Sequence, residues 1–132
     1  MRIFLLCCLL GSMVVSCKPK PSSTADETTP SFVAGSPEAN GQALFSGKGR
    51  CSSCHSLAEN TIIVGPSLAN IGTLAETRVA NQDAKTYLLH SVLRPDAYKP
   101  PGFETKVMDS SLAKSLSSQE LDDIVAYLLT LE

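Results

Sequence analysis

The segment Cys51-Ser52-Ser53-Cys54-His55 constrains this chain more than any other part of its sequence. Two cysteines with two residues between them, followed directly by a histidine, are the sequence form of covalent c-type haem attachment. The two thiols can form thioether bonds to the two vinyl groups of one porphyrin, and the adjacent imidazole can bind its iron. The segment therefore predicts one covalently bound haem c, attached through Cys51 and Cys54, with His55 as an axial ligand of the iron.

Other interpretations of the cysteine pair remain open on the sequence alone. Thioredoxin-like dithiols and half of a zinc site share the C-x-x-C spacing. A zinc site needs a second pair of ligands, and the chain beyond Cys17 has no second cysteine pair. A redox dithiol, or a chance occurrence of the motif in a loop, is the alternative to haem.

The first residues of the chain indicate export across a membrane. Arg2 precedes an apolar run over residues 3–10, which predicts a secretory signal peptide over residues 1–16. Val14-Val15-Ser16-Cys17 resembles a bacterial lipobox, which implies that Cys17 is acylated and becomes the new amino terminus. An uncleaved apolar anchor, or a signal cut elsewhere, is the alternative. We expect a bacterial extracytoplasmic protein, lipid-anchored to a membrane and facing the periplasm or the cell exterior.

The residues after Cys17 predict a tether. Residues 17–36 contain three prolines among mostly small, polar and charged side chains, so they cannot bury enough apolar surface to order themselves. We expect a lipid-anchored disordered tether over residues 17–36, with a mean reach of roughly 25 Å. The folded domain is then expected over residues 37–132, which leaves room for one domain.

Two helices are predicted at the ends of this domain. Ser36-Pro37-Glu38 combines a capping hydroxyl, a proline at the first helical position and an acid in the first turn, and predicts a helix to about residue 46. Ser117 and Glu120 form a capping box in front of an apolar stripe at helical spacing. The pattern therefore predicts a last helix that begins at Ser117.

The sequence between these helices gives weaker signals. A short helix is predicted over residues 68–79, interrupted or ended near Gly72. A clearer one is predicted over residues 83–93, with Asp83 as its cap and Pro95 as its terminator. Three prolines and a glycine in residues 95–103 exclude a helix there. This irregular stretch is expected to cover the second face of the haem.

Four residues of the two end helices add a further pattern. Gly41 and Phe45 share a face of the first helix, and Ile124 and Tyr127 lie close together on the last. With the C-x-x-C-H motif they resemble the class I cytochromes c, whose first and last helices cross at a glycine beside a packed aromatic ring. The resemblance covers about residues 37–132. It implies an all-α, cytochrome c-like fold of four to five short helices wrapped around one haem.

The same resemblance implies roles for residues around the haem. The carbonyl of Pro66 would accept a hydrogen bond from the outer ring nitrogen of His55 and fix the tautomer of that ligand. Leu68 is expected to pack against the haem. Tyr98 and Phe103 belong to the irregular stretch over its second face. Tyr98 has two equal interpretations, a hydrogen bond to a propionate or the loop backbone, and ordinary packing.

Met108 is the predicted sixth ligand of the iron. It is the only methionine beyond the signal peptide, and it lies where the axial thioether of the class I cytochromes c reaches the iron. His90 on the predicted helix is the alternative and would give a bis-histidine haem. Methionine opposite histidine raises the reduction potential. Iron with both axial positions filled has no room for substrate, so we expect outer-sphere transfer of one electron and no catalysis.

The distribution of charge suggests a hypothesis about partners. Lys48, Arg50, Lys99 and Lys106 lie near the haem residues in the sequence, whereas acids collect in the last helix. We therefore hypothesise a weak dipole with its positive end at the haem edge. A solvated surface of mixed sign is the alternative. Nothing in the sequence suggests a nucleic-acid surface.

The leading functional hypothesis is a membrane-tethered carrier with redox protein partners. A quinol-oxidising complex or dehydrogenase would be its donor, and a terminal oxidase or reductase its acceptor. A haem subunit or electron-entry module of a larger oxidoreductase is the second hypothesis. An open-site haem enzyme or sensor, and a non-haem lipoprotein with a redox dithiol, are the others.

Overall fold

The computed structural model describes residues 30–132, and this part of the chain is all-helical. The predicted signal peptide over 1–16, the predicted acylation site Cys17 and most of the predicted tether lie outside the described residues. The elements are α1 (Pro37–Ser46), the 3-10 turn η1 (Cys51–Ser53), α2 (Ile71–Ala75), α3 (Ala84–Leu93), α4 (Ser111–Lys114) and α5 (Ser118–Leu129). The expected all-α fold of short helices is confirmed. Within residues 30–132, no helix is long and apolar enough to span a membrane.

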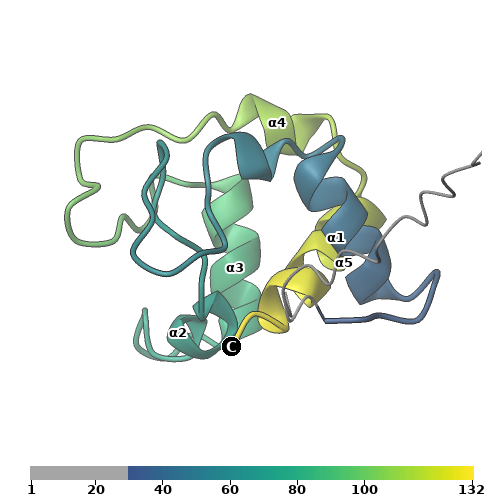
Figure 1. Ribbon diagram of the computed structural model, residues 1–132. Coiled ribbons are helices and arrows are strands. Elements are labelled where there is room, and N and C mark those ends of the chain that lie inside the picture. Colours follow the sequence, from purple (N-terminus) through teal and green to yellow (C-terminus); the bar gives the residue numbers. More distant parts are fainter. Residues whose placement is uncertain (1–29) are drawn as a thin grey trace, which may run out of the picture.

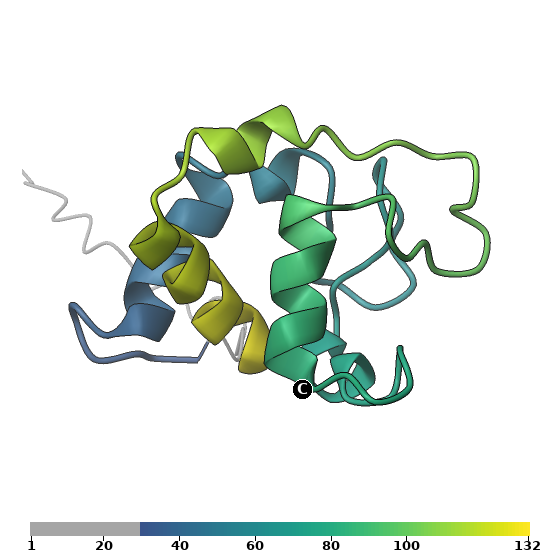
Figure 2. The same ribbon diagram turned by 180° about the vertical axis from the view of Figure 1, so that it is seen from behind.

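The first and last helices, α1 and α5, cross each other on one side of the domain, as Figures 1 and 2 show. Gly41 lies at the crossing, where an added Cβ atom would overlap the carbonyl oxygen of Asp123 and lie 2.7 Å from Cβ of Tyr127. One turn later the ring of Phe45 meets the ring of Tyr127 edge-on, with 5.7 Å between centroids. Ile124 is completely buried beside them. The absent side chain at Gly41 lets the two backbones approach, and the aromatic rings fill the angle between them.

The other helices complete one core around this crossing. Tyr87 and Leu88 of α3 are buried in the same cluster as Phe45 and Ile124. The short helix α2 contacts the carboxyl end of the chain, where the backbone N–H of Gly72 donates to the carbonyl of Leu131 at 2.8 Å. Burying each large apolar side chain stabilises the fold by about 1.5–3 kcal/mol. The core thus fixes α1, α3 and α5. The segments between these helices are held where they join them.

Three helix starts follow the capping residues that the sequence predicts. The side chains of Ser36 and Asp83 each accept a hydrogen bond from the backbone N–H three residues later, at 3.2 and 3.0 Å. Ser117 and Glu120 form both hydrogen bonds of the capping box. These caps satisfy N–H groups that have no partner inside the helix. The predicted starts of α1, α3 and α5 are therefore confirmed.

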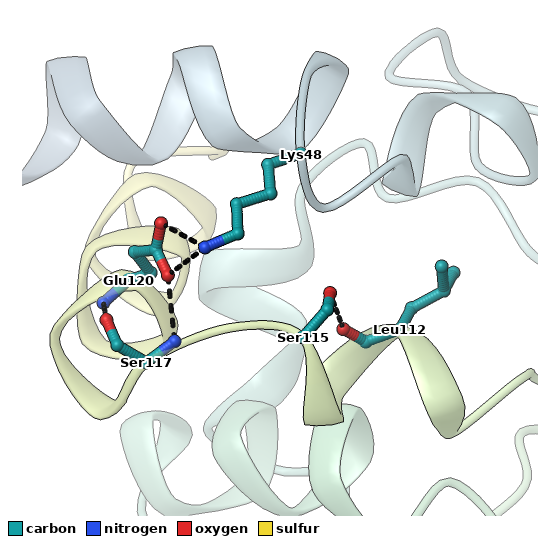
Figure 3. Close-up of polar contacts among 5 residues, drawn as sticks. All are labelled: Lys48, Leu112, Ser115, Ser117 and Glu120. Atoms are coloured by element: carbon teal, nitrogen blue, oxygen red, sulfur yellow. Dashed lines mark hydrogen bonds and ion pairs between the residues drawn. The ribbon is translucent and has the colours of Figure 1, made fainter.

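The capping box of α5 carries an additional ion pair, which Figure 3 shows. Nζ of Lys48 lies 2.8 and 2.7 Å from the two carboxylate oxygens of Glu120. One of those oxygens also accepts from the backbone N–H of Ser117 at 2.8 Å. The hydrogen bond from Lys48, with those from Ser117, holds the pKa of Glu120 below its ordinary value of 4.5. Lys48 thereby links the segment after α1 to the start of α5.

The contacts of Glu120 predict that the stability of the protein depends on pH. A variant with an uncharged side chain at position 120 should lack this part of the pH dependence. The pKa of Glu120 is lower in the folded state than in the unfolded state. The carboxylate therefore adds to the free energy of unfolding above the unfolded-state pKa, and this addition is lost as pH falls through the folded-state pKa. We expect Glu120→Gln, which keeps a capping oxygen, to lose less stability than the parent protein between about pH 7 and about pH 3. Urea denaturation of both holoproteins at the two pH values measures this. Equal losses in the two proteins would contradict it.

Helix α2 is shorter than predicted. The sequence suggested a helix over residues 68–79, whereas the observed helix covers Ile71–Ala75. Asn70 has a φ of 58°, in the left-handed region, so the helix cannot extend back to Leu68. The N–H of Gly72 is bonded to Leu131 and not to a preceding turn. A tertiary contact with the end of the chain therefore sets the start of this helix.

The folded part of the chain begins before Pro37. Phe32, which the sequence placed in the tether, packs edge-on against Tyr127 with 6.0 Å between ring centroids. The backbone N–H of Ser36 donates to the carbonyl of Val33 at 3.0 Å and closes a turn before α1. A single large aromatic group is enough to hold this short arm on α5, since the contact buries it beside an existing aromatic pair. Residues 32–36 thus belong with the domain in this structure.

Candidate functional site

The C-x-x-C-H segment forms a tight turn directly after α1. The backbone N–H groups of Cys54 and His55 both donate to the carbonyl of Cys51, at 3.1 and 2.9 Å. The N–H of Gly49 donates back to Leu44 in α1 at 2.8 Å, which fixes where the turn begins. Both cysteines are free of a disulfide bond, and both line the same cavity. The turn therefore presents two thiols and an imidazole to one space.

The thiol of Cys51 lies in a partly buried environment. Burial raises the pKa of the Cys51 thiol above its ordinary value, and a backbone hydrogen bond opposes part of this shift. Sγ of Cys51 lies 3.6 Å from the carbonyl oxygen of Gly49. A buried thiol of raised pKa is protonated at neutral pH, so the site favours an uncharged sulfur. A thioether is such a sulfur.

His55 is held in one tautomer. Its Nδ1 atom lies 2.8 Å from the carbonyl oxygen of Pro66. A carbonyl oxygen accepts only, so Nδ1 carries the proton in this contact and Nε2 is left with a free lone pair. This is the contact that the resemblance implied. It makes Nε2 the ring atom available to a metal ion.

Gly65 lies directly against the imidazole of His55. A Cβ atom at Gly65 would overlap Cε1 of the ring and lie 2.9 Å from each ring nitrogen. The loop is held in this place by Cys54, whose carbonyl accepts from the N–H groups of Val64 and Gly65 at 3.1 and 2.9 Å. The motif thus positions the same loop that orients its histidine. No role for Gly65 was predicted from the sequence, because the close contact with His55 becomes apparent only in the folded chain.

A largely apolar cavity of about 250 Å³ joins these residues to the loop before α4. Six of the residues predicted to contact haem or iron line it: Cys51, Cys54, His55, Pro66, Phe103 and Met108. They come from two segments that are far apart in sequence. The apolar lining and the short list of sulfur and nitrogen donors are suited to a flat apolar group that carries a metal ion.

Three other candidates do not line this cavity. Leu68 packs against the core, and Tyr98 meets the ring of Tyr87 edge-on with 5.6 Å between centroids. Ordinary packing is therefore the interpretation of Tyr98 that the contacts support. His90 is also absent from the cavity lining, and its Nδ1 atom lies 2.7 Å from Nε2 of Gln82.

Ion pairs reduce part of the charge separation suggested by the sequence. Lys48 is paired with Glu120 on the last helix, so one of the proposed positive charges is joined to the proposed negative end. Lys99 is paired with Asp96 at 2.8 Å. Arg50, Lys99 and Lys106 line the cavity, together with the acid Asp109. The weak dipole with its positive end beside the cavity stays a prediction.

The chain was also compared with known proteins. A family model described as cytochrome c matches residues 38–132, which is most of the part that the structure describes. A comparison with curated proteins gave no match. The matched range begins one residue after the start of α1 and includes every residue of the cavity.

Proposed function

Because the chain belongs to the cytochrome c family, we propose that its single haem c is attached through Cys51 and Cys54 and held by His55 and Met108 as axial ligands. Members of this family bind haem c covalently and are typically electron carriers. The observation that carries the ligand assignment is the contact of His55 Nδ1 with Pro66, which leaves Nε2 free, in a cavity that Met108 also lines.

The bound haem supplies an iron that gains and loses one electron. The chain's own residues set the conditions for this change. His55 is oriented by Pro66 and Gly65, so its donor atom needs little rearrangement. The thioether of Met108 favours the reduced iron and raises the reduction potential. The largely apolar lining of the cavity would disfavour the extra charge of the oxidised state.

Filling both axial positions with protein atoms determines the kind of reaction. With His55 and Met108 both holding the iron, no coordination position would be left for a substrate, and the group would exchange one electron with a partner by an outer-sphere route. This supports an electron carrier over an open-site enzyme or sensor.

We further propose that the carrier is anchored to a membrane. The apolar segment within residues 1–16 and the lipobox-like sequence ending at Cys17 support export and acylation. Residues 17–31 would then join the lipid to the arm that begins at Phe32. The partners would be redox proteins on the outer face of that membrane, with a quinol-oxidising complex or dehydrogenase as donor and a terminal oxidase or reductase as acceptor.

Replacing Met108 with alanine tests the ligand assignment. We expect the ferric holoprotein to lose its methionine–iron charge-transfer band, the ferrous form to bind carbon monoxide readily, and the reduction potential to fall. Optical spectra in both oxidation states and a redox titration measure these effects. His90→Ala is the matched control, because His90 does not line the cavity. A spectrum that changes in His90→Ala and not in Met108→Ala would reverse the assignment.

A further inference from the structure

The loop that carries Met108 has little regular structure of its own. It leaves α3 after Leu93 and returns to the body of the domain at α4, as Figure 1 shows. Phe103 and Lys106 are joined by one backbone hydrogen bond, at 3.0 Å. An axial ligand must be held within a small distance of its metal, so the backbone next to Met108 needs a fixed point.

Asp109, the residue after Met108, has the contacts of such a fixed point. Its Oδ1 atom accepts a hydrogen bond from the backbone N–H of Ser111 at 2.8 Å, which closes a tight turn at the start of α4. Asp109 lines the same cavity as Met108. The turn thus connects the end of the loop directly to a helix.

Helix α4 is itself attached to the domain. Ala113 in its middle is buried, with 6% of its surface exposed. At its end the hydroxyl of Ser115 donates to the carbonyl of Leu112 at 2.7 Å, as Figure 3 shows. Burial of Ala113 is thus the contact that holds α4, and with it the turn at Asp109, against the rest of the domain.

We propose that Asp109 is a positioning residue for Met108: its side chain, by accepting from the N–H of Ser111, holds the adjacent backbone so that the thioether stays at the iron. This inference rests on the proposed function, since it requires Met108 to be a ligand.

Cyanide binding to the ferric holoprotein tests the proposal, because cyanide can reach the iron only when Met108 has left it. Loss of one hydrogen bond to a carboxylate is worth enough to change such an opening equilibrium about tenfold. We expect Asp109→Ala to bind cyanide about tenfold faster than the parent protein. Asp109→Asn keeps an acceptor oxygen that can close the same turn and is expected to stay within about twofold of the parent.

Asp122→Ala is the matched control. Asp122 is an exposed acid on α5 that pairs with Lys85 at 3.3 Å, and it does not line the cavity. We expect its cyanide rate to equal that of the parent protein. An unchanged rate in Asp109→Ala would overturn the positioning role. Equal acceleration in Asp109→Ala and Asp109→Asn would also overturn it, because charge and not the hydrogen bond would then hold the loop.

The Met108→Ala spectrum separates this inference from the proposed function. If that spectrum changes as expected while Asp109→Ala behaves like the parent protein, only the role of Asp109 is wrong. If the ferric spectrum of Met108→Ala equals that of the parent protein, the assignment of Met108 as a ligand fails, and the role of Asp109 fails with it.

Discussion

Gly41→Ala is expected to destabilise the domain by about 3 kcal/mol or more. An added methyl group would overlap the backbone carbonyl of Asp123 and lie 2.6 Å from its carbonyl carbon, so α1 and α5 must separate. Separation opens the contact of Phe45 with Tyr127 and exposes Ile124, the centre of the core. The backbone of α5 cannot rotate away as a side chain can, and interiors are packed too closely to absorb the shift.

Equilibrium denaturation of the holoprotein measures this effect. The sign of the change in the free energy of unfolding distinguishes a helix crossing from an exposed helix position. At an exposed helix position the same substitution stabilises by about 1 kcal/mol, because alanine is the better helix former. Asn40→Ala is the control, since Asn40 is exposed in the same helix. We expect the control to be neutral or slightly stabilising. A Gly41→Ala variant as stable as the parent protein would mean that the helices do not cross as described.

Gly65→Ala is expected to disturb the axial histidine and to lower the stability of the holoprotein by about 1–3 kcal/mol. The new methyl group would overlap Cε1 of His55. A free imidazole could turn aside, but one bound to iron and bonded to Pro66 at 2.8 Å cannot do so without losing a contact. We expect a shifted optical spectrum, a smaller yield of haem-bearing protein and a lower denaturation midpoint.

Gly35→Ala is the matched control for this variant, because Gly35 lies before α1 and outside the loop that carries Met108. A Cβ atom at Gly35 meets no other atom within 4 Å, although its φ of 83° makes a side chain unfavourable there. The positive φ costs about 1–2 kcal/mol, so stability falls in the control as well. Only Gly65→Ala should alter the spectrum of the histidine-bound iron. A normal spectrum in both variants would show that Gly65 does not position His55.

The features that were predictable from the sequence are those whose chemistry is local. The C-x-x-C-H motif places three donors within five residues, and the caps at Ser36, Asp83 and Ser117 act on N–H groups three residues away. A glycine followed by an aromatic residue on one helix face was enough to locate the α1–α5 crossing through a family resemblance. The motif and the caps contain all the atoms that form the local structure, whereas the crossing joins distant segments and was located only through the family resemblance.

The features that escaped prediction depend on contacts between distant segments. Helix α2 is limited by the bond of Gly72 to Leu131, near the end of the chain. The arm at Phe32 is ordered by Tyr127, and the ion pair of Lys48 needs Glu120. In the sequence, Phe32 lies in a segment with the composition of a tether, and Lys48 resembles a solvated surface charge. No local pattern distinguishes these cases from unpaired residues.

Helix α4 and the role of Asp109 had a weak local signal. An aspartate followed two residues later by Ser111 at a helix start is a known turn pattern, and Leu112 and Ala113 continue it with good helix formers. The segment is only four residues long, and tertiary packing of Ala113 decides whether it forms. The role proposed for Asp109 becomes apparent only from its place in the cavity lining beside Met108.

Mass spectrometry under denaturing conditions is the most direct test of covalent haem attachment at Cys51 and Cys54. The protein would be produced in cells able to attach haem to C-x-x-C-H motifs and then digested on both sides of the turn. We predict one haem retained per chain, carried by the peptide that contains both cysteines. Folded protein whose cysteine peptide has the mass of two thiols or of a disulfide, without haem, would contradict the account.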